Sequence, residues 1–505
     1  MKRNNKLIKI ISAFIILAVL FILFACGDKN AGSNGDGENA ATDAGETAPE
    51  PEPEEIKSPV PENVKFGGDE IRILNCTYFQ EEILFINAEE EIGEIVNDAV
   101  YRRNLKVQND LEVNFKFIDI SMQGGGNFSQ MVRNSVNAGS DDYDILFGVQ
   151  YDAVQLATAG VYKNLVDMPY INLDNPWWPA KHIQEEYSIG KEVLYFLAGD
   201  ISLNFVRNMG CAYFNKQLYT DNFGDPDDFF KLILDGKWTH DKLSEMSRAA
   251  YRDLNGDGQF DDDDQYGGVV ITSNLTDHFT YAAGVRVTAR DEHGVPYLIM
   301  NNERTVNYVN KLHSLYYEND GIRIFPPTEE TNNVNVPAKF MRDELLFSFG
   351  WFYISEFLRD MPSDYGIIHF PKLDENQPTY LSLAHDIVPL YSAPVTCGKA
   401  EAVGAVLESM AFESYKTVLP AYYETALKIK YTRGANEDAI KIIDIIHANV
   451  TTDFGYIYNY TLNNIGLILR DLMGSRSADF ASRYERSEEK IQASLERIVA
   501  AYLDN

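Results

Sequence analysis

An acidic twelve-residue segment, 253–264, has the most specific spacing of side-chain oxygens in the sequence. It fits the calcium-loop template, with oxygen ligands at positions 1, 3, 5, 7, 9 and 12 and a glycine at position 6. The predicted ligands are Asp253, Asn255, Asp257, the backbone carbonyl of Gln259, Asp261 and Asp264. Asp264 at the last position resembles dockerin-type loops, and Phe260 is expected to pin the loop to the core. We expect a structural calcium ion here, the alternative being an acidic surface turn without metal.

Other residues with potential chemistry form no catalytic pattern. The glycines 124–126 lack the Lys-Ser/Thr ending of a phosphate-binding loop and the spacing of a dinucleotide fingerprint, so they predict a flexible turn. Cys76, Cys211 and Cys397 are widely spaced and have no metal-ligand pattern. We interpret these three cysteines as buried small hydrophobic residues and predict no disulfide.

The N-terminal region has the pattern of an exported protein. Basic residues precede an apolar run over 10–25, which is shorter than a membrane-spanning helix and predicts a signal peptide over residues 1–25. The following Cys26 resembles the lipid-modified cysteine of a bacterial lipobox. Residues 26–65 are rich in Pro and Glu and poor in large apolar side chains, which predicts a disordered tether. We expect a domain anchored through lipid on Cys26.

Length and charge restrict the class of the folded part. Some 440 residues follow the tether, more than one hydrophobic core usually serves, so two lobes are expected. The formal net charge is −32, which disfavours nucleic acid and polyanionic partners.

The first part of the folded chain predicts a parallel α/β sheet. Strand-type patterns at 70–75, 113–118 and 143–148 alternate with helical patterns at 83–110 and 128–137. Crossover helices between strands are typical of parallel sheets. Ligands of such sheets bind beyond the carboxyl ends of the strands, here the loops after Leu74, Ile120 and Phe147.

The second part repeats this order of elements with insertions. The periodicities predict strands at 266–272 and 345–349, a helix at 304–318, a hairpin at 287–300, and C-terminal helices at 440–449, 462–473 and 487–503. Trp238 precedes Thr239, a predicted helix N-cap, and is therefore assigned to packing.

Five short strings carry a family resemblance, and their order and spacing matter more than any one of them. They are the segments 143–148, 159–165, 175–178, 213–216 and 345–351. Together they resemble the extracellular solute-binding proteins of family 1, the maltose-binding-protein type. The resemblance covers nearly everything after the tether.

The resemblance implies a two-lobed α/β fold of the type II periplasmic-binding-protein kind, with crossing hinge strands and a helical C-terminus. The implied first lobe comprises residues 66–200 and 387–440, and the second comprises 201–386 and 441–505. It further implies a monomer at the outer face of the cytoplasmic membrane that binds a carbohydrate between the lobes and delivers it to the permease of an ABC importer. No enzymatic activity is implied.

Sugars present apolar faces and a rim of hydroxyls, so their sites need aromatic rings and polar side chains. By position, Trp351 resembles the family's stacking aromatic, and the preceding Gly350 is expected to let ligand approach the backbone. The further candidates that the resemblance suggests are Tyr151, Asp152, Phe279, Tyr281, His385, Asp386 and Asp200. Asp200 is expected either to face the cleft or to cap a turn.

Two alternatives stay open. A secreted glycoside hydrolase would need two carboxylates about 5 to 10 Å apart, and 76 acidic residues leave room for such a pair. The same fold could also bind another solute, such as a peptide, a polyamine or an acidic sugar, because the side chains of a cleft vary freely within one fold.

Overall fold

The computed structural model describes residues 57–328, 331–424 and 437–503. Cys26, the predicted signal peptide and the predicted tether up to residue 56 lie outside the described residues. For these segments, the interpretation from sequence stays a prediction. Residues 57–65 of the predicted tether are described, and Val60 is 4% exposed in the core of the first lobe, so the folded part begins earlier than predicted.

The first lobe is built on a four-stranded sheet with the order β12-β3-β1-β2. Strands β1 (Asp69–Thr77), β2 (Val113–Ser121) and β3 (Ile145–Val149) are parallel, and β12 (Pro389–Ser392) runs antiparallel to β3. All five residues of β3 are buried, as expected for a central strand of apolar residues. The predicted alternation of strand and helix is confirmed.

The crossover helices of this sheet are α2 (Ile95–Leu111) and α3 (Phe128–Asn137). Helix α2 begins later than its sequence pattern suggests, after a short 3-10 helix, η1 (Gln80–Phe85). The carboxylate of Glu94 accepts a hydrogen bond from the backbone N–H of Asn97 at 2.7 Å, which caps the helix there. Residues 86–94 therefore form a loop that follows η1.

The second lobe is built on a five-stranded mixed sheet with the order β10-β4-β9-β5-β8. Its strands are β4 (Gly210–Asn215), β5 (Tyr266–Ile271), β8 (Ile322–Phe325), β9 (Leu345–Trp351) and β10 (Tyr365–Ile368). Strand β5 is parallel to β8 and β9, whereas β4 is antiparallel to β9 and β10. The two strands predicted from sequence, β5 and β9, are confirmed.

The helices of the second lobe begin where the sequence carries capping residues. The hydroxyl of Thr239 accepts the backbone N–H of Lys242 at 3.3 Å and caps α9 (His240–Ala250). The preceding Trp238 is fully buried, and its indole N–H donates to the carbonyl of His369 at 2.9 Å. The assignment of Trp238 to packing is confirmed. The other helices here are α7 (Lys216–Phe223), α8 (Pro226–Leu234), α10 (Asn274–Ala282), α11 (Glu303–Tyr317), α12 (Val336–Met341) and α13 (Ile354–Phe357).

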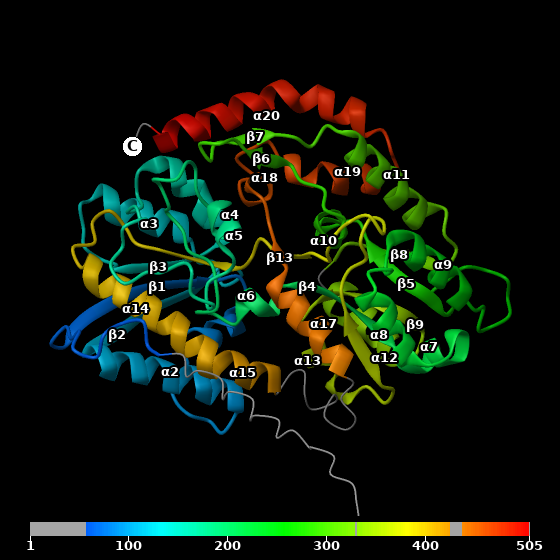
Figure 1. Cartoon of the computed structure of the whole chain (residues 1–505), viewed down its shortest axis with the longest axis horizontal. Coiled ribbons are helices and arrows are strands. Elements are labelled where there is room, and N and C mark those ends of the chain that lie inside the picture. Colours follow the sequence, from blue (N-terminus) through cyan, green and yellow to red (C-terminus); the bar gives the residue numbers. More distant parts are fainter. Residues whose placement is uncertain (1–56, 329–330, 425–436, 504–505) are drawn as a thin grey trace, which may run out of the picture. The chain divides into compact units, whose positions relative to one another are not determined.

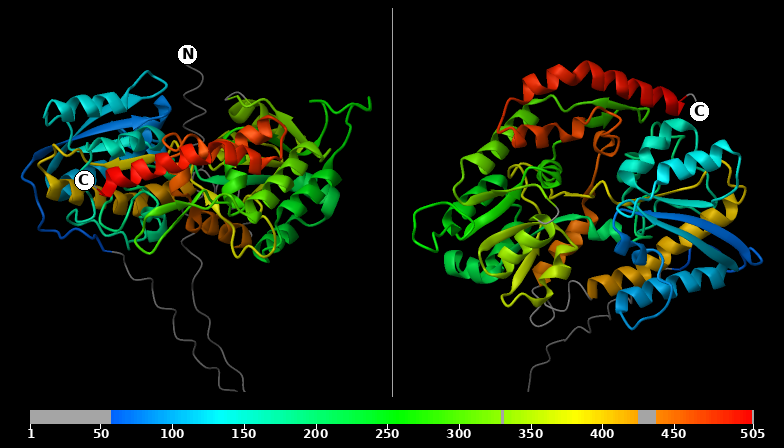
Figure 2. Two further views of the ribbon diagram at one scale, coloured as in Figure 1. Left: turned by 90° about the horizontal axis from the view of Figure 1, so that it is seen from above. Right: turned by 180° about the vertical axis from the view of Figure 1, so that it is seen from behind.

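The chain crosses between the lobes in segments that pair with one another. Met209 and Ala384 form an antiparallel bridge, and the N–H of His385 donates to the carbonyl of Asn208 at 3.1 Å. Next to this crossing, β11 (Ser382–Leu383) is parallel to β13 (Val450–Thr451). Figure 1 shows the strands of the two sheets in separate halves of the ribbon, with these segments between them, and Figure 2 shows the same division from two other sides. The predicted two-lobed fold class is confirmed.

The C-terminal region is helical and touches both lobes. Its helices are α17 (Glu437–Ala448), α18 (Phe454–Ile457), α19 (Ile468–Gly474) and α20 (Phe480–Leu503). Helix α17 packs on β10 and α8 and contains the predicted lobe boundary at residue 440. Helix α20 contacts the 3-10 helix η2 (Val154–Ala159) of the first lobe and α11 of the second. It runs along one edge of both lobes (Figure 1), beside the predicted hairpin of β6 (Thr288–Arg290) and β7 (Pro296–Leu298).

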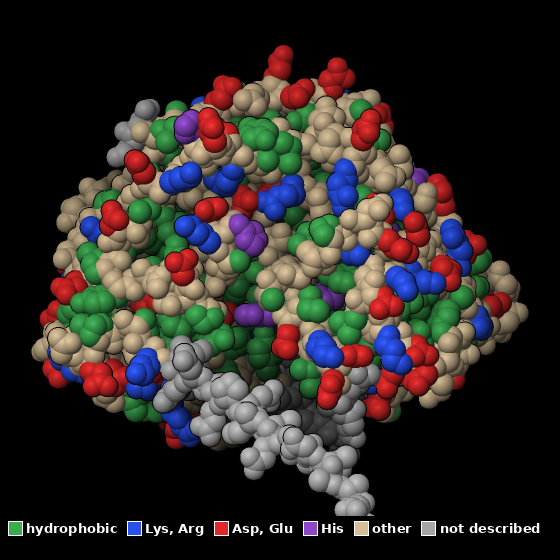
Figure 3. All heavy atoms as spheres, viewed as in Figure 1, with side chains coloured by type: hydrophobic (Ala, Val, Ile, Leu, Met, Phe, Trp, Pro, Cys, Tyr) green, Lys and Arg blue, Asp and Glu red, His purple; other side chains and the backbone are tan. Residues whose placement is uncertain are grey.

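Acidic side chains are scattered over the face that Figure 3 shows, with several Lys and Arg side chains across its upper middle. None of the helices in the described part of the chain combines the length and the apolarity needed to cross a lipid bilayer. Cys76, Cys211 and Cys397 are buried free thiols, as the sequence predicts.

Candidate functional site

A cavity of about 560 Å³ lies between the two lobes. From the first lobe it is lined by Tyr78 and Phe79, directly after β1, and by Tyr151 and Gln155, after β3. Ligands of α/β sheets bind at the carboxyl ends of parallel strands, and these residues stand there. Two of the three loops expected at the site from the sequence therefore line the cavity.

The third expected loop, after β2, is not among the segments that line this cavity. It forms a tight turn in which Gly125 has a φ of +85° and the N–H of Gly126 donates to the carbonyl of Ser121 at 2.8 Å. The positive φ requires glycine or a strained residue. The turn predicted for residues 124–126 is confirmed.

The second lobe lines the cavity with residues that follow its own strands. Ser273 and Asn274 come after β5, Pro327 and Thr328 come after β8, and Trp351 and Tyr353 stand at the end of β9. The crossing segments add Asn208, His385, Asp386 and Ile387, and the C-terminal region adds Tyr460 and Arg470. Side chains from distant parts of the sequence thus meet in one cavity.

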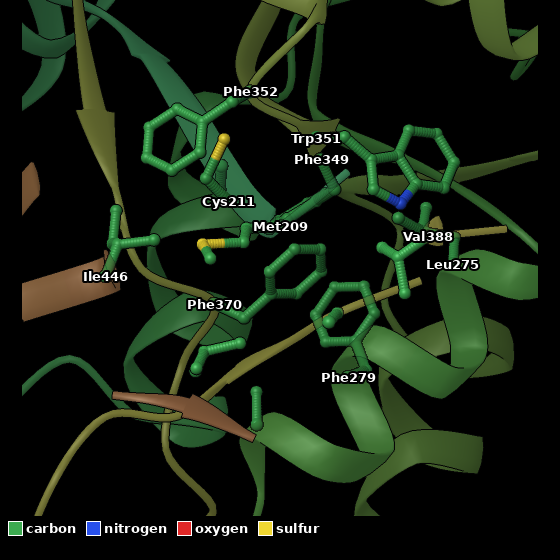
Figure 4. Packing of buried hydrophobic residues seen from close by; sticks show 14 of the residues in the cluster. Met209, Cys211, Leu275, Phe279, Phe349, Trp351, Phe352, Phe370, Val388 and Ile446 are labelled. Atoms are coloured by element: carbon green, nitrogen blue, oxygen red, sulfur yellow. The ribbon is translucent and has the colours of Figure 1, made fainter. Parts of the chain in front are cut away.

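Trp351 belongs to the wall of the cavity, but it is buried and 2% exposed. Its indole N–H donates to Nε2 of His278 at 2.7 Å, and its ring is parallel to that of Tyr353, with centroids 5.6 Å apart. Burial lowers the pKa of His278 far below its ordinary value, which keeps the accepting imidazole neutral. Figure 4 shows the indole beside Val388 and Leu275. Trp351 therefore supports the site from behind, and the half-buried Tyr353 is the more accessible ring.

The glycine before Trp351 does not provide room for a ligand. A Cβ atom at Gly350 would lie 3.0 Å from Cγ1 of Ile354, so the missing side chain makes space for Ile354. This position corrects the expectation that ligand approaches the backbone at Gly350.

Phe279 and Tyr281 do not reach the cavity, because β5 is followed by helix α10 rather than by a long loop. Phe279 is fully buried against Phe349 and Phe370, at centroid distances of 4.8 and 4.9 Å. Figure 4 shows these three rings packed together. The ring of Tyr281 contacts Tyr456 at 5.1 Å. Both expected ligand residues are core residues, and the start of α10 contributes Asn274 to the cavity instead.

The two remaining aspartates of the predicted set also have structural partners away from the cavity. Asp152 accepts hydrogen bonds from the backbone N–H and the hydroxyl of Ser129, at 3.2 and 2.6 Å, and so fixes the first turn of α3. Asp200 is buried, and its carboxylate lies 3.6 Å from Nε2 of His447 on α17. Of the eight predicted positions, Trp351, Tyr151, His385 and Asp386 are brought together at the cavity.

Two pairs of titratable side chains lie at the cavity. Arg470 forms a two-pronged ion pair with Asp277 of α10, in which its Nε lies 2.8 Å from Oδ1. Burial alone would lower the pKa of Arg470. The negative charge of Asp277 and its hydrogen bonds have the larger effect, so the pKa of the guanidinium is raised. Asp386 accepts from Nδ1 of His385 at 2.8 Å. Burial would raise the pKa of Asp386, but His385 and Arg470 outweigh it, so its pKa lies below the ordinary value.

Sequence reasoning missed most residues of the cavity wall, among them Tyr78, Phe79, Tyr353, Tyr460 and Arg470. Tyr78 and Phe79 carried a signal, since they follow β1 in a loop that was already expected at the site. Tyr460 and Arg470 carried none, because nothing in their local sequence places the C-terminal region at the cavity.

In the predicted calcium loop, backbone N–H groups of the loop donate hydrogen bonds to its own side chains. The carboxylate of Asp253 accepts the N–H groups of Gly256 and Gly258 at 2.6 and 2.9 Å. The buried Asp264 accepts from the hydroxyl of Tyr251 at 3.0 Å. Among the described residues, no group of three or more His, Cys, Asp or Glu side chains is arranged to hold a metal.

Phe260 is 50% exposed and stacks on Tyr251, with ring centroids 4.8 Å apart. It therefore holds the loop against a neighbouring ring and does not enter the core, which corrects the role expected for it. The calcium ion itself stays a prediction.

Comparison with known proteins shows that this chain resembles solved structures in its fold but not closely in its sequence. No protein-family model matches the sequence, and no curated protein matches it. Among solved structures, a cyclic α-maltosyl-1,6-maltose binding protein from Arthrobacter globiformis matches with a TM-score of 0.55 and 13% identity, over 87% of this chain and 100% of that one. A cyclo/maltodextrin-binding protein complexed with maltotetraose matches with a TM-score of 0.53 and 12% identity, over 86% and 97%.

A third structure, UgpB from Mycobacterium tuberculosis in complex with glycerophosphocholine, matches with a TM-score of 0.51 and 15% identity, over 79% of this chain and 95% of that one. The chain has the two-lobed fold of these solute-binding proteins. Because each match spans nearly the whole of the other chain, the likeness extends over both lobes. The first two of these neighbours are sugar-binding proteins, and the third was solved with glycerophosphocholine bound.

Proposed function

We propose that this protein binds a small carbohydrate in the cavity between its lobes and delivers it to the permease of an ABC importer. The observation that carries the proposal is the chemistry of the cavity wall. Half-buried aromatic rings from both lobes stand beside amide, carboxylate and guanidinium groups at the carboxyl ends of strands. Aromatic faces suit the apolar faces of sugar rings, and the polar groups suit their hydroxyls. Sugar-binding neighbours of the same fold support this assignment.

A hydrolase is the weaker candidate, because its chemistry needs two carboxylates flanking one bond. Among the described residues that line the cavity, Asp386 is the sole carboxylate. Asp277, behind it, is engaged by Arg470.

A calorimetric titration of the purified protein with a panel of neutral, amino and acidic sugars tests the proposal. We expect saturable binding of at least one sugar, with no product released on prolonged incubation. Release of a shorter sugar would overturn the assignment as a binding protein. Binding of peptides alone would overturn the assignment of the ligand class.

We also propose that the mature protein is held at the outer face of the cytoplasmic membrane by lipid on Cys26. Replacing Cys26 with alanine should abolish labelling by a radioactive fatty acid and leave the precursor uncleaved by the lipoprotein peptidase, because the thiol that carries the lipid is gone. Cys76→Ala serves as the control, since Cys76 is a buried thiol of the folded body. Unchanged lipidation of the Cys26→Ala protein would contradict the proposal.

The 253–264 loop is the proposed calcium site. A ligand that binds only the folded state stabilises it by about 2.7 kcal/mol when its free concentration is 100 times its Kd. Removal of calcium by a chelator should therefore lower the Tm. Asp257→Ala should abolish this sensitivity because it removes a predicted ligand. Asp291→Ala is the matched control, since Asp291 also accepts backbone N–H groups in an exposed turn, at 2.9 Å from His293 and Val295. Equal Tm values with calcium and with chelator in metal-free protein would refute the site.

A further inference from the structure

The cavity wall holds one guanidinium and one carboxylate, which differ in their partners. Among the described residues that line the cavity, Arg470 is the one Lys or Arg. Its guanidinium donates hydrogen bonds to both carboxylate oxygens of Asp277. A two-pronged Arg–carboxylate pair satisfies both charges and fixes the geometry of the guanidinium. The positive charge of Arg470 is therefore already matched from behind the cavity wall.

Asp386 forms no ion pair with a Lys or Arg among the described residues. Its side chain is 13% exposed, and its hydrogen-bond donor is the Nδ1 of the adjacent His385, at 2.8 Å. The other ring nitrogen of His385 lies 3.0 Å from the amide nitrogen of Asn274. The backbone N–H of Ile387 also lies 3.2 Å from Nδ1 of His385. The contacts of His385 with Asn274 and Ile387 thus fix the orientation of the Asp386 carboxylate.

The rings around this carboxylate also favour a positive ligand. Tyr78, Phe79, Tyr151 and Tyr353 are half-buried in the cavity wall, and Tyr460 is 47% exposed. Tyr151 lies against Tyr78 and Tyr460, with ring centroids 6.4 and 5.8 Å away. The face of an aromatic ring attracts a cation through its quadrupole, and this attraction grows when the cation is desolvated. A carboxylate within an aromatic wall is therefore suited to an ammonium group.

We propose that the ligand carries a positively charged amine that Asp386 recognises, and that an amino sugar is the ligand class of this cavity. This inference rests on the proposed carbohydrate function, which supplies the sugar part. The amine is an additional requirement that a neutral maltodextrin would not meet.

A neighbouring feature favours the opposite charge and defines the competing outcome. A second cavity of about 800 Å³ shares Ser273, Pro327 and Arg470 with the first and is also lined by Arg483 and Arg486. These arginines suit a carboxylate or phosphate. However, Arg483 is paired with Asp471 at 2.6 Å, and Asp471 and Asp479 line the same cavity. The carboxylate that stands among the aromatic rings and forms no ion pair with a Lys or Arg is that of Asp386.

The test is a calorimetric comparison of glucosamine, glucose and glucuronic acid, and of the β-1,4-linked disaccharides of glucosamine and glucose, at neutral pH. We expect the amino member of each set to bind at least about tenfold more tightly than the neutral member. Equal or tighter binding of the neutral or acidic members would overturn the inference and leave the carbohydrate function intact. Ethanolamine and spermidine complete the panel: if they alone bind, the carbohydrate function fails and the charge preference stands. If no compound binds, both fail.

The variant Asp386→Asn keeps the shape of the side chain and removes its charge. We expect it to reduce the preference for the amino member to below about threefold. Asp235→Asn is the matched control, since it removes one negative charge from the exposed surface, where Asp235 pairs with Lys237 at 3.1 Å. A preference that is unchanged in Asp386→Asn, or lost equally in both variants, would overturn the role of Asp386.

Discussion

Replacing Trp351 with alanine should lower the free energy of unfolding by about 3 to 5 kcal/mol, as truncation of a buried tryptophan typically does. The indole is 2% exposed, so the substitution leaves a cavity in the core. It also removes the donor to Nε2 of His278, whose other ring nitrogen already has no hydrogen-bond partner among the described residues. A buried acceptor without a donor adds to the loss. Urea denaturation followed by circular dichroism measures it.

The matched variant is Tyr353→Ala. Tyr353 stacks on Trp351 but is half-buried at the cavity, so its removal should weaken sugar binding by about tenfold and cost less stability. Comparing the two variants thus distinguishes a residue that packs behind the site from a residue that contacts the ligand. If Trp351→Ala instead keeps the wild-type urea midpoint and loses affinity, the indole is a ligand platform, as the family resemblance implies.

The order of elements was predictable because it depends on local patterns. The fully apolar residues of β3, the alternation in β2 and the N-cap of α9 each reflect interactions within a few residues. The start of α2 was predicted too early because apolar spacing alone does not reveal where a helix is capped. Here the cap is the hydrogen bond from the backbone N–H of Asn97 to the carboxylate of Glu94.

The site was only half predictable, for the same reason. Tyr151 and Asp386 follow or join elements that were recognisable in the sequence, and both line the cavity. Phe279 has an equally suitable side chain, but a helix begins at Asn274 and its periodicity turns Phe279 into the core. Arg470 reaches the cavity through its pairing with Asp277, 193 positions earlier in the chain, and no local signal encodes such a contact.

The same ion pair supports the second large expected effect. Arg470→Met should destabilise the fold by about 3 to 5 kcal/mol at neutral pH, because it leaves the carboxylate of Asp277 buried without a cation. Asp277 is 2% exposed. Methionine retains much of the length of the arginine side chain, so the loss reflects mainly the missing charge. Denaturant midpoints of the variant and the wild type at pH 7 measure it.

The pH dependence of this variant identifies the cause. Burial raises the pKa of Asp277 above its ordinary value even with Arg470 in place, and loss of the guanidinium raises it further. An acid whose pKa is raised in the folded state binds more protons there than in the unfolded state, so stability falls as pH rises through that folded pKa. The deficit of Arg470→Met should therefore shrink as the pH is lowered and Asp277 becomes protonated. Adding Asp277→Asn removes the buried charge and should restore most of the stability and abolish this pH dependence. A deficit that is constant across pH and persists in the double variant would show that the lost packing of the arginine stem, and not the unpaired carboxylate, is responsible.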